Sequence, residues 1–78
     1  MDVHRLVKMA NEIGEFFGQM PDREETVAAI TAHLRNFWEP RMRREIIEHA
    51  RRDGSELKEI VRAAVLRLEG SQTPAEPR

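Results

Sequence analysis

The sequence predicts a small all-α protein: an irregular bundle of about four short helices, followed by a disordered C-terminal tail. Four stretches of the chain repeat apolar residues at helical spacing, and no stretch has the pattern of a β-strand. Gly, Pro or Asp stands at each junction between them, as is typical of helix ends and starts. We therefore expect one helical domain over residues 1–69 and a disordered tail over residues 70–78, which has two Pro and no apolar anchor.

The first helix is expected over residues 2–18, with Asp2 as its N-cap. Its apolar residues occupy about half of the helix circumference, whereas a core-facing stripe needs little more than about 100°. The excess lies along one edge, formed by Met9, Phe16 and Met20. Such an edge fits a contact with another protein, or a central helix that touches two neighbours.

The second helix is expected to begin after Asp22, which fits an N-cap with Glu25 at the third helical position of a capping box. It runs to about Trp38, the only Trp of the chain. Its predicted apolar face consists of Val27, Ile30, Leu34, Phe37 and Trp38. This face directs Trp38 toward the core, and His33 lies beside it.

Pro40 is well placed to open a third helix, and it holds Glu39 out of helical geometry. The resulting corner should bring Trp38 and Arg41 close together on rigid elements. The helix is expected to bury Met42, Ile46, Ile47 and Ala50. Arg43 falls inside this apolar arc, so its guanidinium must reach solvent, pair with a carboxylate or contact a partner.

Residues 35–52 hold six Arg and three Glu, although the net charge of the whole chain is −1. The outer face of the third helix is expected to carry Arg41, Arg44, Arg51 and Arg52 together with Glu45 and Glu48. Most such faces are solvated and contain pairs four residues apart, such as Arg44–Glu48. A contact with an acidic or phosphate-bearing group is the alternative.

The third helix is expected to end at Asp53 and Gly54, with Gly54 as a left-handed cap. Ser55 is then the predicted N-cap of the fourth helix. The apolar face of that helix consists of Leu57, Ile60, Val61, Ala64, Val65 and Leu68.

The residues that carry chemistry are sparse. The chain has no Cys, its three His are far apart in sequence, and its four Gly stand singly. We therefore predict no catalytic residue, no cofactor-binding residue and no metal-binding residue. The chain has no apolar run long enough for a membrane span and no secretory signal pattern. Since so small a chain buries little surface alone, burial against a partner is its expected supplement.

One segment connects these features, and it reads Phe37-Trp38-Glu39-Pro40-Arg41-Met42-Arg43. Further matching segments are Met9-Ala10-Asn11, Ile13, Phe16-Phe17 and Val61-Arg62-Ala63-Ala64-Val65. Together they give a chain that resembles, over roughly residues 3–68, the small delta subunit of NAD-dependent, molybdenum-containing formate dehydrogenases. Two details depart from that pattern: Glu39 replaces the usual Asp, and the early part of the fourth helix lacks a Pro.

The resemblance implies a non-catalytic accessory subunit of a cytoplasmic enzyme that oxidises formate to CO2 and reduces NAD. In that family the larger subunits carry the bis-MGD molybdenum cofactor (molybdenum bis(guanine dinucleotide)), iron–sulfur clusters and FMN, and this chain alone would bind none of them. Its implied role is to support assembly, stability, or insertion and retention of the molybdenum cofactor. The implied partners are the larger catalytic subunits, and no contact with a membrane is expected. Self-association of the isolated chain is a further expectation.

The resemblance and the wide first helix together give the candidate contact residues, which are Met9, Asn11, Phe16, Met20, Phe37, Trp38, Arg41, Met42 and Arg43. Docking is expected to bury the corner at Trp38 and Arg41 and the wide face of the first helix. The competing prediction is a small helix-turn-helix-like nucleic-acid-binding protein that contacts phosphates through the third helix. The balanced charge of the chain argues against it.

Overall fold

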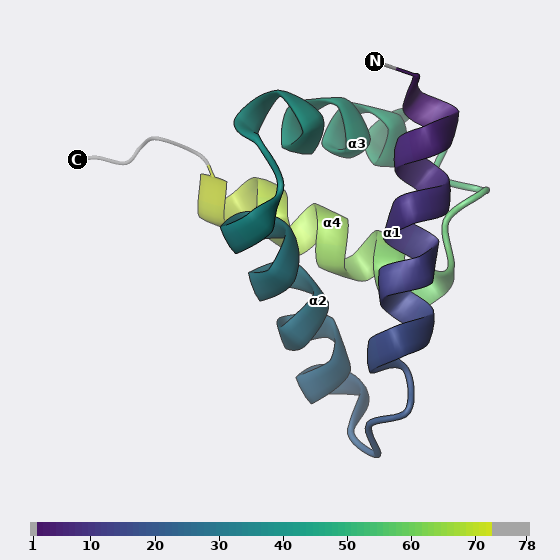
Figure 1. Ribbon diagram of the computed structural model, residues 1–78, viewed down its shortest axis with the longest axis vertical. Coiled ribbons are helices and arrows are strands. Elements are labelled where there is room, and N and C mark those ends of the chain that lie inside the picture. Colours follow the sequence, from purple (N-terminus) through teal and green to yellow (C-terminus); the bar gives the residue numbers. More distant parts are fainter. Residues whose placement is uncertain (1, 73–78) are drawn as a thin grey trace.

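The computed structural model describes residues 2–72, which form four α-helices and no strand. The helices are α1 (Val3–Phe17), α2 (Arg23–Phe37), α3 (Pro40–Arg52) and α4 (Glu59–Gln72) (Figure 1). The predicted all-α class and the number of helices are confirmed. None of the helices in this part of the chain is long and apolar enough to cross a membrane.

The helices form an irregular bundle and not a parallel one. Figure 1 shows α1 and α2 running in opposite directions, with α3 across one end of the pair and α4 crossing both. The fourth helix packs against each of the other three. The core therefore forms around α4, and the outward sides of α1 and α2 are left uncovered by it.

The core consists almost entirely of the residues that the apolar periodicity selects. Fully buried side chains include Leu6, Val27, Ile30, Leu34, Ile46, Val61, Val65 and Leu68. Gly14 is buried where α1 meets α4, and a Cβ atom at this position would collide with the side chain of Val61. The close approach of these two helices therefore depends on a residue without a side chain.

Local capping signals explain where the first three helices begin and end. The Asp2 carboxylate accepts a hydrogen bond from the His4 N–H (3.0 Å). The Asp22 carboxylate accepts one from the Glu24 N–H (3.1 Å), one residue before the amide that a capping box uses. Pro40 occupies the first turn of α3, and Gly54 has the expected positive φ of 64°. The predicted caps at Asp2, Asp22 and Gly54 are confirmed.

The start of α4 differs from the prediction. Residues 53–58 form turns, α4 begins at Glu59, and the prediction that Ser55 caps this helix is wrong. The cap comes from α1 instead: Asn11 Oδ1 accepts from the Lys58 N–H (2.9 Å), and Asn11 Nδ2 donates to the Glu56 carbonyl (2.9 Å). A side chain 47 residues earlier in the chain thus sets where the last helix starts.

The far end of α4 lies beyond the predicted domain boundary. The helix continues to Gln72, through the first three residues of the predicted tail. The rest of that prediction concerns residues 73–78, which lie outside the described residues.

Candidate docking surface

Four aromatic rings from α1 and α2 form a continuous row, which we call the aromatic strip: Phe16, Phe17, His33 and Phe37. Ring centroids are 5.1 Å apart for Phe16–Phe17, 5.9 Å for Phe17–His33 and 4.8 Å for His33–Phe37. The two ends of the strip are strongly exposed, Phe16 by 75% and Phe37 by 74%. The ring edges and faces already pack against one another, so the strip is a preformed apolar surface.

An open groove of about 380 Å³ runs beside the strip between α1 and α2. Its lining consists of Met9, Ile13, Phe16, Phe17, His33 and Trp38, with Glu12 as the acidic residue. Trp38 is only 6% exposed, so it reaches the groove from the core. Strip and groove together form a concave apolar surface of the kind that receives another molecule's side chains.

The neighbouring residues Phe37 and Trp38 take opposite positions, although the sequence predicted both on one face. Phe37 is the last residue of α2, whereas Trp38 leaves helical geometry with φ −89° and ψ 143°. This extended conformation turns the indole inward. Phe37 stays at the edge of the apolar arc, beyond the reach of the core, and its candidacy as a contact residue remains a prediction.

The Arg43 guanidinium holds this corner through hydrogen bonds to backbone carbonyls. Its Nη1 donates to the carbonyl of Arg35 (2.8 Å) and to the carbonyl of Trp38 (2.5 Å). These carbonyls belong to the end of α2, where backbone acceptors lack helical partners and the helix dipole is negative. The guanidinium within the apolar arc therefore caps the preceding helix, and it joins α3 to α2.

The other candidate contact residues are dispersed. Met9 lines the groove, and Met20 is 37% exposed just past the end of α1. Arg41 is exposed beside Glu45 at 4.0 Å, and the half-buried Met42 packs against the core. Asn11 holds the loop before α4 and is engaged inside the molecule. The structure thus gathers Met9, Phe16, Phe37 and Trp38 at one surface, and it places Arg41, Met42 and Arg43 at the α2–α3 corner.

Sequence reasoning did not include Phe17 and His33 among the candidates. His33 stood beside the predicted apolar arc, and it is four residues before Phe37, the spacing at which helix side chains touch. That spacing was the available signal for the row of rings. For Phe17 the available signal was its place in the matching segment Phe16-Phe17.

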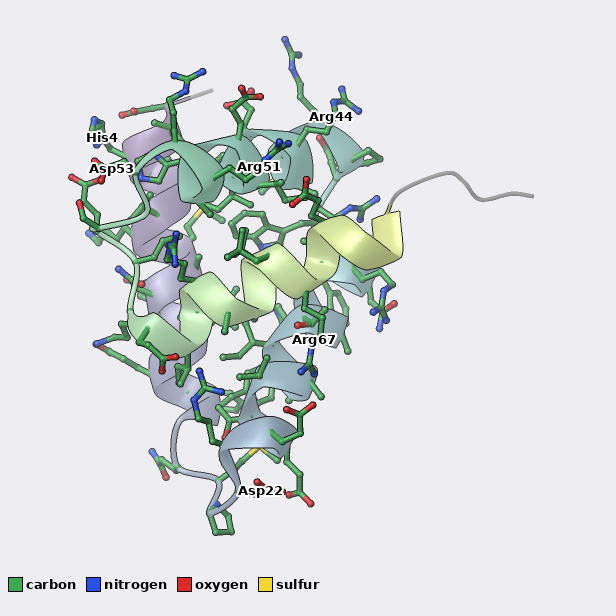
Figure 2. The ribbon with its side chains drawn as sticks, turned by 180° about the vertical axis from the view of Figure 1, so that it is seen from behind. His4, Asp22, Arg44, Arg51, Asp53 and Arg67 are labelled. Carbon is green, nitrogen blue, oxygen red and sulfur yellow. The ribbon has the colours of Figure 1, made fainter. Side chains whose placement is uncertain are left out.

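The arginines of α3 are mostly paired. Glu48 pairs with Arg52 (3.3 Å), not with Arg44 as predicted, and Arg51 reaches across to Glu69 of α4 (3.1 Å). Figure 2 shows Arg44 on the outside of α3 and Arg51 between α3 and α4. Because paired carboxylates accompany most of these guanidiniums, the helix-turn-helix alternative gains no support from this face.

Within residues 2–72, no group of three or more His, Asp or Glu side chains is placed to hold a metal ion. The whole chain lacks the Cys thiolates that hold iron–sulfur clusters. The donor set that these residues offer does not fit a metal cofactor or a cluster.

A family model described as NADH-dependent formate dehydrogenase delta subunit FdsD matches residues 5–65, which include the whole aromatic strip and the first half of α4. No curated protein and no solved structure gave a match. Since the matched segment covers most of the 78 residues, the chain belongs to the family of delta subunits of NADH-dependent formate dehydrogenase, as its resemblance predicted.

Proposed function

We propose that this chain is an accessory subunit without a catalytic site of its own, which docks through the aromatic strip and its groove onto a larger subunit of the formate dehydrogenase complex. The observation that carries the proposal is the exposure of Phe16 and Phe37 at the two ends of a preformed row of rings. Burying one such side chain is worth about 1.5–3 kcal/mol. Well-packed aromatic residues are also the usual energetic centre of an interface.

The proposed lack of a catalytic site is supported by how the polar side chains are used. Arg23 of α2 pairs with Glu59 of α4, and Arg67 of α4 pairs with Glu24 of α2 at 2.7 Å. Asn11 and Arg43 bond backbone groups at helix ends. These groups connect helices, and the groove itself is lined mainly by apolar side chains.

Docking would make the chain a support for assembly and stability of the complex, or for insertion and retention of the molybdenum cofactor in the catalytic subunit. On this proposal the larger subunits carry the bis-MGD molybdenum cofactor, the iron–sulfur clusters and FMN, oxidise formate to CO2 and reduce NAD. This chain would contribute its own apolar surface, which covers apolar side chains that the catalytic subunit would otherwise expose to water.

The test uses the complex prepared without this chain. Wild-type chain, Phe16→Ser, Phe37→Ser and the control Arg44→Ser are each added back, and co-elution, molybdenum content and formate-dependent NAD reduction are measured. Wild type and Arg44→Ser should co-elute and raise molybdenum content or activity, whereas the two Phe variants should elute separately. Co-elution of both Phe variants at the wild-type level would contradict the proposed surface.

A further inference from the structure

We propose that the groove beside the aromatic strip receives an α-helix of the larger subunit, and that this helix presents an apolar stripe with a Lys or Arg opposite Glu12. This inference rests on the docking proposed above, and it adds the secondary structure and the charge of the partner segment. Three properties of the groove support it: its walls, its length and the state of the Glu12 carboxylate.

The walls of the groove offer few backbone groups to a partner. Both walls are helices, whose N–H and C=O groups are bonded within α1 and α2 up to their last turns, and at the end of α2 Arg43 occupies the carbonyls of Arg35 and Trp38. An extended segment lying here would bury its own backbone donors and acceptors without partners, which is costly. A helix brings its backbone already paired, so only its side chains need to fit.

The length of the groove suits one helix. Along α1 the lining of the groove runs from Met9 to Phe17, which at the helical rise spans about 12 Å. A partner helix that lies along this wall therefore contacts the groove over about two turns. Its apolar side chains must recur at three- and four-residue spacing to reach Met9, Phe16 and Phe37 from one side.

The charge of the partner follows from Glu12. This residue lies at the groove, is exposed, and its carboxylate makes no hydrogen bond or ion pair within residues 2–72. Its neighbour on α1, Glu15, is by contrast paired with Lys58 at 3.5 Å. Because the remaining lining is apolar or aromatic, Glu12 is the charge that the groove offers, and a cationic residue opposite it complements the groove. Such a pair at an interface edge mainly sets orientation, association rate and salt dependence.

The experiment measures the affinity of the full chain for the complex prepared without it, at low and at high salt. The variants are Glu12→Lys, Glu12→Gln and the control Glu25→Lys, which makes the same change of charge at an exposed position of α2. We expect Glu12→Lys to weaken binding by about tenfold at low salt and by less at high salt, because salt screens an exposed pair. Glu12→Gln should fall between wild type and Glu12→Lys, and Glu25→Lys should bind like wild type.

The outcomes separate this inference from the proposed function. Loss of binding in Phe16→Ser and Phe37→Ser with wild-type binding of Glu12→Lys keeps the docking surface and overturns the charge of the partner. Tighter binding of Glu12→Lys would mean an acidic partner segment, and equal weakening by Glu25→Lys would mean a general charge effect; either result overturns the inference. Wild-type binding by the two Phe variants overturns the surface and this inference together.

The helical nature of the partner has its own readout. Hydrogen exchange with mass spectrometry compares the larger subunit with and without bound chain, and circular dichroism confirms that each variant is folded. The expected result is protection of a segment with apolar residues at helical spacing and a Lys or Arg among them. Protection of a segment in which apolar and polar residues alternate, as in a β-strand, would contradict a helical partner segment. Sedimentation showing a dimer that the Phe variants abolish, with the complex unaffected, would assign the groove to a second copy of this chain.

Discussion

Nη1 of Arg43 lies 2.5 Å from the backbone carbonyl oxygen of Trp38, so a side chain of α3 binds the residue at which α2 ends. The same atom donates to the Arg35 carbonyl one turn earlier. This contact fixes the angle between the two helices and the direction in which the indole enters the core. The α2–α3 corner is therefore held by a charged group bonded to backbone, and it does not depend on Pro40 alone.

Removing this contact should destabilise the protein. Hydrogen bonds from a charged donor contribute about 1.5–3 kcal/mol, so we expect Arg43→Ala to lower the free energy of unfolding by about 2 kcal/mol. Arg43→Lys keeps the charge but loses the planar donor geometry, so its free energy of unfolding should lie between those of the wild type and Arg43→Ala. Urea unfolding followed by circular dichroism measures this difference. The control Arg41→Ala, at an exposed residue with a 4.0 Å pair, should change stability by less than about 0.5 kcal/mol; an equal loss in both variants would show that the carbonyl contacts are not the cause.

The two adjacent aromatic residues at this corner should respond in opposite ways. Trp38 is buried, so Trp38→Ala should lower the free energy of unfolding by about 3–5 kcal/mol. Phe37 is exposed, so Phe37→Ala should change it by about 0.5 kcal/mol or less while weakening association with the larger subunits. Thermal unfolding of the isolated variants gives the first quantity and add-back to the complex gives the second. A stability loss in Phe37→Ala as large as that of Trp38→Ala would mean that Phe37 packs in the core.

The cap that α1 supplies to α4 can be tested through Asn11. Asn11→Ala removes both hydrogen bonds to the loop and should cost about 1–2 kcal/mol of stability. Asn11→Asp keeps an acceptor for the Lys58 N–H but loses the donor to Glu56, so its cost should be smaller. Amide exchange at Lys58 should accelerate in Asn11→Ala and much less in Asn11→Asp, which keeps the acceptor, and Ser55→Ala should leave it unchanged. Fast exchange in Ser55→Ala alone would restore Ser55 as the cap.

Gly14 allows a test of the α1–α4 contact. Ala is the better helix former by about 1 kcal/mol, yet Gly14→Ala should destabilise by about 1–3 kcal/mol because its methyl group overpacks Val61. The added substitution Val61→Ala should recover part of that loss, which a double-mutant cycle detects. Gly70 is the matched control: it lies in α4 with open space around it, so Gly70→Ala should stabilise by up to about 1 kcal/mol. Stabilisation by Gly14→Ala would show that the two helices are free to move apart.

Features encoded by adjacent residues could be predicted from the sequence, and this explains most of the fold. Asp2, Asp22, Pro40 and Gly54 act on the backbone within a few residues of themselves, so they mark helix ends reliably. The start of α4 depends on Asn11, whose partners lie 45 and 47 residues away, and no local pattern shows such a contact. The sequence therefore offered Ser55, a suitable cap that the structure does not use.

The candidate docking surface, too, could be predicted from the sequence only in part. A helical wheel assumes that the helix continues, and it placed Phe37 and Trp38 on one face because it could not show that helical geometry stops between them. The resemblance to the delta subunit family named Phe16 and Phe37 as matched residues, but periodicity alone could not tell an exposed ring from a buried one. The row of rings depends on how α1 and α2 pack, which is a tertiary property.

The link between Asn11 and Lys58 also bears on the kinetics of folding. Hydrogen bonds join the first helix to the segment just before the last one, across 45 and 47 residues of the chain, so the loop that they close is long and forms late. The aromatic strip needs only residues 16–37, which leave the ribosome well before Lys58. A nascent chain thus exposes the aromatic strip before its core has formed. Early contact with the larger subunit would shorten the time during which this apolar surface can aggregate.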